Sequence, residues 1–243
     1  MTPFHRARVL VVGAGGLGCP ATLVLARAGI GSLTIVDPDV VDVTNLHRQL
    51  WHTDADVGRP KVVSASEKLR VAFPHLEVCA EQVEVGAANV DALFARHDLV
   101  IDGTDGIGVK FLLSDAAVRT RVPLVYGGVL QMQGQAMVIA PGGPCLRCLF
   151  ETPPSPDEVP TCAQAGVLGS MAGVVGALQA ELGLRQLAFG AGAVAGFLHT
   201  FDGARLLPRC RKVRRAPDCT ACADGATPPV PFDLEPRSAS CRR

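Results

Sequence analysis

The sequence carries no excess of charge of either sign. Its 23 Lys and Arg residues are balanced by 23 Asp and Glu residues. Proteins whose overall field attracts nucleic acid or an anionic membrane surface carry a marked excess of cations. We therefore expect neither nucleic acid nor a membrane as partner. The one basic cluster, at 209–215, fits a solvated strand face, and docking of an acidic partner is the alternative.

The sequence also lacks a recognisable secretory signal, because the early apolar run Val9–Val12 is short and leads into a glycine turn. The uncharged stretch 159–180 is long enough to span a bilayer. Its glycines, Pro160 and Gln179 favour instead a buried helix with close backbone packing. Nine cysteines form an odd set in a chain of 243 residues, which is large enough to fold without disulfides. We expect a cytoplasmic protein whose thiols serve metal binding or chemistry.

No internal repeat and no linker is visible, so the pattern predicts one domain over 1–223 and a loosely ordered tail over 224–243. Apolar runs and helical spacings alternate along the chain, which is typical of an α/β fold. The expected architecture is a Rossmann-like doubly wound sheet, mostly parallel, with additional C-terminal strands. Strands are predicted at 8–13, 32–37, 75–83, 98–103, within 122–140 and within 198–215; helices are predicted at 17–29, 60–73, 88–95, 107–120 and 166–187.

The stretch "GAGGLG" at 13–18 matches the glycine pattern of nucleotide-binding loops between a strand and a helix. Gly13 permits the tight turn, Gly15 with Gly16 lets the backbone approach phosphate, and Gly18 allows close helix–strand packing. Free N–H groups at the helix start favour an anion. Asp37, at the end of the second strand, is placed to bind ribose hydroxyls. Alone, this pattern predicts an adenine nucleotide, with NAD the default.

The following segments favour a triphosphate over NAD. Asp37 opens a polar segment that contains Asp39, Asn45, Arg48 and Gln49, and Lys61 begins the next helix. Phosphate oxygens need cations and forked donors, whereas a dehydrogenase has little use for Arg48 and Lys61 at the same phosphate end. An exposed first-turn lysine is the alternative for Lys61.

Two carboxylates follow the fourth predicted strand. Asp102 and Asp105 stand at its carboxyl end, the edge where open α/β sheets bind ligands. A carboxylate there can hold Mg²⁺ that bridges phosphates. We assign this role to Asp105, while Asp102 is equally well explained as a helix N-cap.

The cysteines include two C-x-x-C pairs, Cys145 with Cys148 and Cys219 with Cys222. Two such pairs suit one tetrahedral zinc with four thiolates and leave no open position for catalytic water. We expect a structural Zn²⁺, and a redox pair is the alternative. Cys162 lies in an irregular segment before a helix, where a helix N-terminus favours the thiolate; an inert buried thiol is the alternative.

With these residues in place, the chain resembles the ThiF/MoeB/HesA family, bacterial relatives of ubiquitin-activating enzymes. The resemblance covers about residues 7–223 and rests on the ordered set "VLVVGAGGLGCPA", "VDPDVVDVTNLHRQ", "GRPK", "DGTDG", "PLVYGGVLQMQGQ", "PGGPCLRCLF", "VPTCAQAGVLGSMAGVVGALQA" and "PDCTAC". It implies an adenylyltransferase that binds MgATP and joins AMP to the Gly-Gly carboxylate of a small ubiquitin-fold sulfur-carrier protein, for thiocarboxylate formation. It also implies a homodimer.

The resemblance implies roles for matching residues. The glycine loop would cradle ATP and Asp37 would bind ribose. Asn45, Arg48 and Lys61 would hold the phosphates and steady the transition state. Asp105 would place Mg²⁺, the four paired cysteines would hold zinc, and Cys162 would carry sulfur or an acyl group, a role that is dispensable in some members.

The chain departs from the family pattern in three respects. Gly106 and Lys110 replace a usual Asn and Arg. The family usually has an N-terminal arginine that reaches the neighbouring subunit's site; here either the start of the sequence is misassigned, or Arg6 or Arg8 substitutes for it, or adenylation is impaired. No rhodanese domain is present, so a sulfur donor such as a cysteine desulfurase or rhodanese would be a separate protein. Three other functions stay open: the same chemistry in peptide or natural-product tailoring, a non-catalytic binding scaffold, and an NAD-dependent dehydrogenase.

Overall fold

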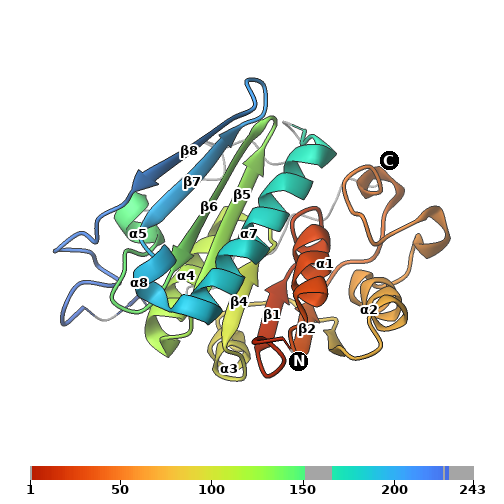
Figure 1. Ribbon diagram of the computed structural model, residues 1–243, viewed down its shortest axis with the longest axis horizontal. Helices are drawn as coiled ribbons and strands as arrows, with labels where there is room; N and C mark the ends of the chain where they lie inside the picture. Colours follow the sequence, from red (N-terminus) through yellow and green to blue (C-terminus); the bar gives the residue numbers. More distant parts are fainter. Residues whose placement is uncertain (1, 151–165, 227, 230–243) are drawn as a thin grey trace.

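The computed structural model describes residues 2–150, 166–226 and 228–229. Its centre is one eight-stranded sheet in the order β3-β2-β1-β4-β5-β6-β7-β8 (Figure 1). Pairing is parallel from β3 to β5 and antiparallel from β5 to β8. The strands are β1 Arg8–Val12, β2 Ser32–Val36, β3 Glu77–Glu81, β4 Leu99–Asp102, β5 Leu124–Leu130, β6 Gln133–Ile139, β7 Phe197–Asp202 and β8 Leu207–Lys212.

Helices cover both faces of the sheet, as the doubly wound prediction requires (Figure 1). α1, α2 and α7 pack on one face, and α3 and α4 pack on the other. Residues of the central strands alternate between the two cores, because successive side chains point to opposite faces. The helices are α1 Gly18–Ala28, α2 Lys61–Ala72, α3 Val90–Ala95, α4 Ile107–Thr120, α5 Leu146–Leu149, α7 Gly169–Phe189 and α8 Ala191–Val194, with 3₁₀ turns η1 Val43–Asn45 and η2 Asp54–Asp56.

The glycine-rich helix α7 lies across the sheet and against α1. A Cβ at Gly183 would come within 2.7 Å of Leu99 Cδ2, so the missing side chain allows the close approach. A Cβ at Gly176 would likewise lie 2.4 Å from the Leu17 carbonyl oxygen. The predicted buried helix with tight backbone packing is confirmed from Gly169 onward, and 159–165 lie outside the described residues. In the part of the chain that the structure describes, no helix is long and apolar enough to cross a membrane.

Most predicted elements are confirmed with boundary shifts of a few residues. The short helices α5 and α8 and the 3₁₀ turns η1 and η2 were not predicted. Part of the basic cluster lies on an exposed strand face: Arg209, Arg211 and Lys212 belong to β8, every residue of which is exposed, whereas Arg214 and Arg215 follow the strand. Docking of an acidic partner stays open as the alternative. The prediction of a loosely ordered tail remains open, since 227 and 230–243 lie outside the described residues.

The sheet has a topological switch point between β1 and β4. The helix that follows β1 packs on one face, and the helix that follows β4 packs on the other. Loops at the carboxyl ends of these two strands diverge and leave the crevice in which open α/β sheets bind ligands. The strand order also places the loop after β1 between those after β2 and β4. The predicted glycine loop, Asp37 and Asp105 therefore share one edge.

Candidate nucleotide site and cysteine cluster

The loop after β1, residues 13–18, is tightly enclosed by its neighbours. Gly13 has φ +98°, and a Cβ there would lie 2.6 Å from the carbonyl oxygen of Gly103, in the loop after β4. A Cβ at Gly16 would lie 3.2 Å from Ala172 Cβ of α7. Backbone without side chains is therefore required where these segments meet. The contact with Gly103 also brings the Asp105 loop next to the glycine loop.

Asp37 braces the glycine loop. Its carboxylate accepts a hydrogen bond from Ala14 N–H at 2.7 Å and another from Asp39 N–H at 2.8 Å. Burial raises the pKa of Asp37, and the nearby cation of Lys61 opposes that rise. The side chain lies beside the loop, where the sequence predicted it, and its role in ribose binding stays a prediction.

Lys61 is the first residue of α2 and is 6% exposed. Its ammonium forms an ion pair with Asp39 at 2.8 Å, and its N–H donates to the Asp39 carbonyl at 3.0 Å. The alternative of an exposed first-turn lysine is therefore wrong. Asp39 N–H bonds to Asp37, and Asp37 accepts from Ala14 of the glycine loop, so the chain of contacts places the Lys61 cation close to that loop.

The turn that carries Arg48 and Gln49 lies against the same loop. The Arg48 guanidinium donates to Asn45 Oδ1 at 2.5 Å, and its Cδ is 3.6 Å from the position of a Cβ on Gly16. Gln49 is buried, with Nε2 3.7 Å from the corresponding position on Gly15. Its Oε1 has no hydrogen-bond partner among the described residues. A buried unpaired acceptor is costly, so its place beside the loop fits a site that a polar ligand completes.

Asp102 ends β4 and is fully buried. It accepts hydrogen bonds from Thr104 N–H at 3.0 Å and from Lys110 Nζ at 3.0 Å. The interpretation of Asp102 as a helix cap is wrong, because α4 begins at Ile107 with Gly106 as its N-cap. Asp105, by contrast, is exposed in the loop beside Gly103. Its position fits the predicted contact with a phosphate-bound Mg²⁺, which stays a prediction.

Two polar residues next to this edge were missed by sequence reasoning. His52 is buried, with Nε2 3.1 Å from the Ala14 carbonyl and Nδ1 2.9 Å from Ser64 Oγ. Gln179 of α7 donates to the Asp102 carbonyl at 2.7 Å and to the Val125 carbonyl at 3.1 Å. The only sequence signal for Gln179 is a polar residue in an apolar helix. His52 has none beyond its place after "HRQLW".

The two predicted cysteine pairs converge. The Sγ atoms of Cys145, Cys148, Cys219 and Cys222 all lie within 4.8 Å of one another. The Cys145–Cys219 and Cys148–Cys222 sulfur distances are 3.6 and 3.3 Å. Tetrahedral Zn–S bonds of about 2.3 Å place sulfurs about 3.8 Å apart, so donor set and spacing fit zinc. Burial and the other thiols raise the pKa of Cys145, so a cation is needed to hold it as thiolate.

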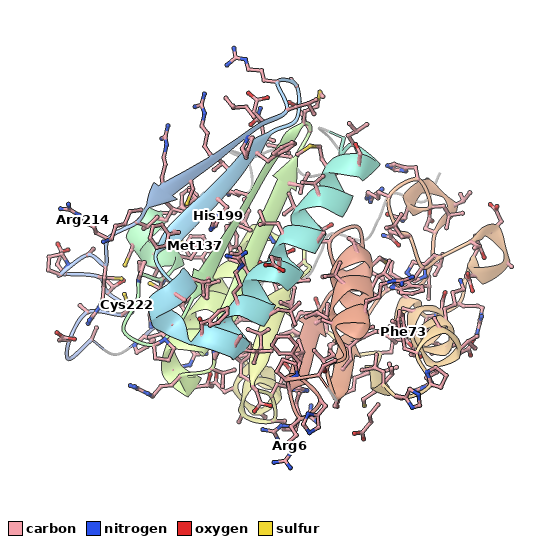
Figure 2. The ribbon with its side chains drawn as sticks, in the orientation of Figure 1. Arg6, Phe73, Met137, His199, Arg214 and Cys222 are labelled. Atoms are coloured by element: carbon pink, nitrogen blue, oxygen red, sulfur yellow. The ribbon has the colours of Figure 1, made fainter. Side chains whose placement is uncertain are left out.

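The surroundings of the cluster join it to α4. Leu146 N–H donates to Ser114 Oγ at 3.1 Å, and the Arg147 guanidinium forms an ion pair with Asp115 at 2.8 Å. Ala216 N–H donates to Cys148 Sγ at 3.4 Å. Cys222 and Phe73, which follows α2, lie toward opposite ends of the longest axis (Figure 2). The cluster therefore lies at the opposite end of the molecule from the C-terminal end of α2.

The remaining cysteine prediction concerns Cys162, which lies outside the described residues. Cys19, at the start of α1, is buried, and burial raises its pKa to about 12. Its thiol donates to the Ala14 carbonyl at 3.2 Å. Cys19 is thus a packed thiol within the fold of the glycine loop.

The chain is similar to known proteins over almost all of its length. The sequence model of the ThiF family matches residues 2–221. The "Adenylyltransferase and sulfurtransferase MOCS3" of Anopheles gambiae is 45% identical over 232 residues, which are 95% of this chain and 53% of that protein. The chain thus spans about half the length of that relative. The "Sulfur carrier protein adenylyltransferase" of Thermus thermophilus is 41% identical over 95% of this chain and 87% of that protein.

A solved structure has the same fold. Escherichia coli MccB superposes with a TM-score of 0.80 at 18% identity, covering 91% of this chain and 66% of that one. Identity this low supports the fold alone. The family match is more specific, because it extends over the glycine loop and the Arg48–Lys61 segment. It also includes three of the four clustered cysteines and ends one residue before the fourth, Cys222. The chain belongs to the ThiF family.

Proposed function

We propose that this chain is an ATP-dependent adenylyltransferase that activates the C-terminal Gly-Gly carboxylate of a small ubiquitin-fold sulfur-carrier protein. One observation carries the proposal. The glycine loop, the buried cation Lys61, the Arg48–Gln49 turn and the Asp105 loop converge at one edge of the sheet. The name of the Thermus thermophilus relative, at 41% identity, supports this substrate class.

The site suits attack of a carboxylate on a triphosphate. An oxygen of the carrier's C-terminal carboxylate forms a bond to the α-phosphorus of ATP. The bond from that phosphorus to the bridging β-phosphate oxygen breaks, and pyrophosphate leaves with the bond's electron pair. Nucleophile and phosphate are both anionic, so the chain's contribution is positioning and charge screening rather than proton removal. Arg48 and Lys61 supply cations for this, and the loop's N–H groups supply dipoles.

Asp105 is the residue proposed to hold Mg²⁺, which would neutralise charge on the phosphates. Asp37 and Asp39 are proposed to contact the ribose side of the nucleotide, and Asn45 and Gln49 its phosphate side. Gly13, Gly15, Gly16 and Gly18 form the proposed cradle. The four clustered cysteines are proposed to bind a structural Zn²⁺.

The proposed next step is sulfur transfer. The acyl-adenylate would accept sulfur from a donor such as a cysteine desulfurase or rhodanese, with Cys162 as the candidate carrier on this chain. The chain is proposed to act as a homodimer. Within one chain Arg8 pairs with Asp98 at 2.8 Å, and Arg6 lies near the amino ends of the strands, away from the glycine loop (Figure 2). Any role for these arginines is therefore in the neighbouring subunit's site.

The test is ATP–pyrophosphate exchange with a panel of purified ubiquitin-fold proteins that end in Gly-Gly. Exchange that depends on one carrier, and is lost when its terminal glycine is deleted, is the expected result. Mass spectrometry of that carrier after addition of a sulfur donor should show a thiocarboxylate. ATP binding without exchange for any carrier would contradict the proposal and favour a binding scaffold. An amide product would favour the peptide-tailoring alternative.

A further inference from the structure

The peptide group of Ala14, the second residue of the glycine loop, is held from both sides. Its N–H donates to Asp37 at 2.7 Å. Its carbonyl lies 3.1 Å from His52 Nε2, and His52 is 5% exposed. The other ring nitrogen, Nδ1, lies 2.9 Å from Ser64 Oγ of α2. One buried imidazole therefore connects the glycine loop to the helix that begins at Lys61.

The partners fix the protonation of the His52 ring. A carbonyl oxygen only accepts, so Nε2 must carry the hydrogen that faces Ala14. Ser64 Oγ lies 3.3 Å from Lys68 Nζ, and an ammonium only donates. The hydroxyl accepts from Lys68, and its own hydrogen can go to Nδ1 or to the carboxylate of Asp56, which also bonds to Ser64. Burial lowers the pKa of His52 and the cations of Lys68 and Lys61 act in the same direction, while the bond to the Ala14 carbonyl and the Asp56 carboxylate oppose that shift. The net shift is downward, so we expect a neutral ring at pH 7, with its hydrogen on Nε2 facing the Ala14 carbonyl.

His52 also fixes a third segment. Its own N–H donates to the Gln49 carbonyl at 3.1 Å and closes the turn that follows Arg48. That turn places Arg48 against Gly16 and Gln49 against Gly15. The glycine loop, the Arg48–Gln49 turn and the start of α2 come from three separate stretches of sequence. The two ring nitrogens and the backbone N–H of His52 contact all three.

We infer that His52 is a positioning residue for ATP, and this inference rests on the proposed function. Its side chain does not face the nucleotide, because both ring nitrogens are bonded within the protein. It holds the glycine loop and the Lys61 helix at the spacing that the triphosphate requires. The effect of losing it should therefore fall on ATP affinity more than on the chemical step once ATP is bound.

The test compares His52→Leu with His52→Gln. Leucine fills the space but offers neither donor nor acceptor. A glutamine amide carries a donor and an acceptor in one plane, as the neutral imidazole does, and can serve both Ala14 and Ser64. Binding of MgATP to the full chain without carrier is measured by isothermal titration calorimetry. We expect about tenfold weaker binding for His52→Leu, equivalent to one lost hydrogen bond, and near-normal binding for His52→Gln.

A matched control separates positioning from general destabilisation. His97 is also buried and bonded at both nitrogens, to the Leu93 carbonyl at 2.7 Å and to Thr34 Oγ1 at 2.8 Å. It lies beyond α3, near the amino end of β4. His97→Leu should lower thermal stability as His52→Leu does, but leave ATP affinity unchanged. Equal affinity losses in the two leucine variants would overturn the inference.

Two further measurements keep the inference testable in every case. If His52→Leu fails to fold, Ser64→Ala takes its place and should weaken ATP binding several-fold; unchanged affinity would contradict the inference. ¹⁵N NMR of the histidine rings at pH 7 should show His52 as the Nε2–H tautomer, and the Nδ1–H tautomer or a charged ring would overturn it. Because neither measurement needs a carrier, failure of carrier adenylation would contradict the proposed function and leave the test of His52 intact.

Discussion

The ammonium of Lys110 lies 3.0 Å from the carboxylate of Asp102, and both groups are almost completely buried where β4 ends. The same Nζ donates to the Thr104 carbonyl at 2.8 Å and to the Gly127 carbonyl at 2.6 Å. All three of its hydrogens therefore have acceptors. The pair ties α4, the loop before Asp105 and β5 together under the nucleotide edge.

Lys110→Met should destabilise the fold strongly. The methionine fills most of the volume but leaves the Asp102 carboxylate buried without a cation, and breaking a buried pair from one side costs about 3–5 kcal/mol. Urea unfolding followed by circular dichroism measures the change. The matched control is Lys212→Met on the exposed strand β8, which should stay within about 0.5 kcal/mol of the wild type.

A double variant tests the cause of that loss. The double variant Lys110→Met, Asp102→Asn removes both charges. It should recover part of the free energy of unfolding that Lys110→Met alone loses. A double variant as unstable as the sum of the two single variants would show that the two residues do not interact.

The cysteine cluster should hold one zinc per chain. Cys219→Ser removes one of the four thiolates that would bind the metal. The other three sulfurs then lie close together with no cation between them. We expect the bound zinc to be lost and stability to fall by about 3 kcal/mol or more, equivalent to a fall in Tm of roughly 6–12 °C. Elemental analysis and thermal unfolding measure both. Cys210→Ser, an exposed cysteine on β8, is the control. Full stability of the metal-free protein would contradict a structural zinc.

The doubly wound fold was predictable because its signals are local. Apolar runs and helical spacings mark each strand and helix, and the glycine pattern needs only six consecutive residues. The C-x-x-C pairs are equally explicit, and their meeting in space is what one tetrahedral zinc would require. The short helix α5 was missed because four residues are too few to show a helical period.

The supporting contacts of the site were not predictable. The His52–Ala14 contact joins residues 38 positions apart, and neither residue type marks the other. Asp102 was open to interpretation as a cap because a carboxylate before a helix has that preference. The structure instead starts α4 at Ile107 and buries Asp102 against Lys110. The burial of Lys61 depends likewise on Asp39, which the sequence shows only as one acid in a polar segment.

Lys61→Ala should impair catalysis while the protein still folds. Its partner Asp39 has a side chain that is 42% exposed, so water can solvate that carboxylate when the lysine is removed. We expect kcat/KM for ATP in pyrophosphate exchange to fall by about 10²–10³-fold, since a cation at developing phosphate charge is lost. Arg185→Ala, an exposed arginine of α7, is the control and should exchange normally. Normal pyrophosphate exchange by a folded Lys61→Ala protein would show that Lys61 does not contribute to the reaction.

Stability should fall as the solution becomes mildly acidic. Burial lowers the pKa of His52, His97 and His199 in the folded chain. Above about pH 6.5 these rings are neutral in both states. Below it, the unfolded chain takes up protons that the folded chain does not, so the free energy of unfolding falls as pH falls. Each fully buried histidine contributes at most about 1.4 kcal/mol per pH unit, until its folded-state pKa is reached.

His97→Gln isolates one part of this pH dependence. Its slope of unfolding free energy between pH 6.5 and 5.5, from urea unfolding, should be shallower than that of the wild type. His75→Gln, at an exposed position, should keep the wild-type slope. The raised pKa of Asp37 contributes with the opposite sign, because the folded chain binds that proton more readily. Both proteins contain Asp37, so its contribution cancels in the difference between slopes. Equal slopes for His97→Gln and the wild type would mean that His97 is protonated as easily inside the fold as in the unfolded chain.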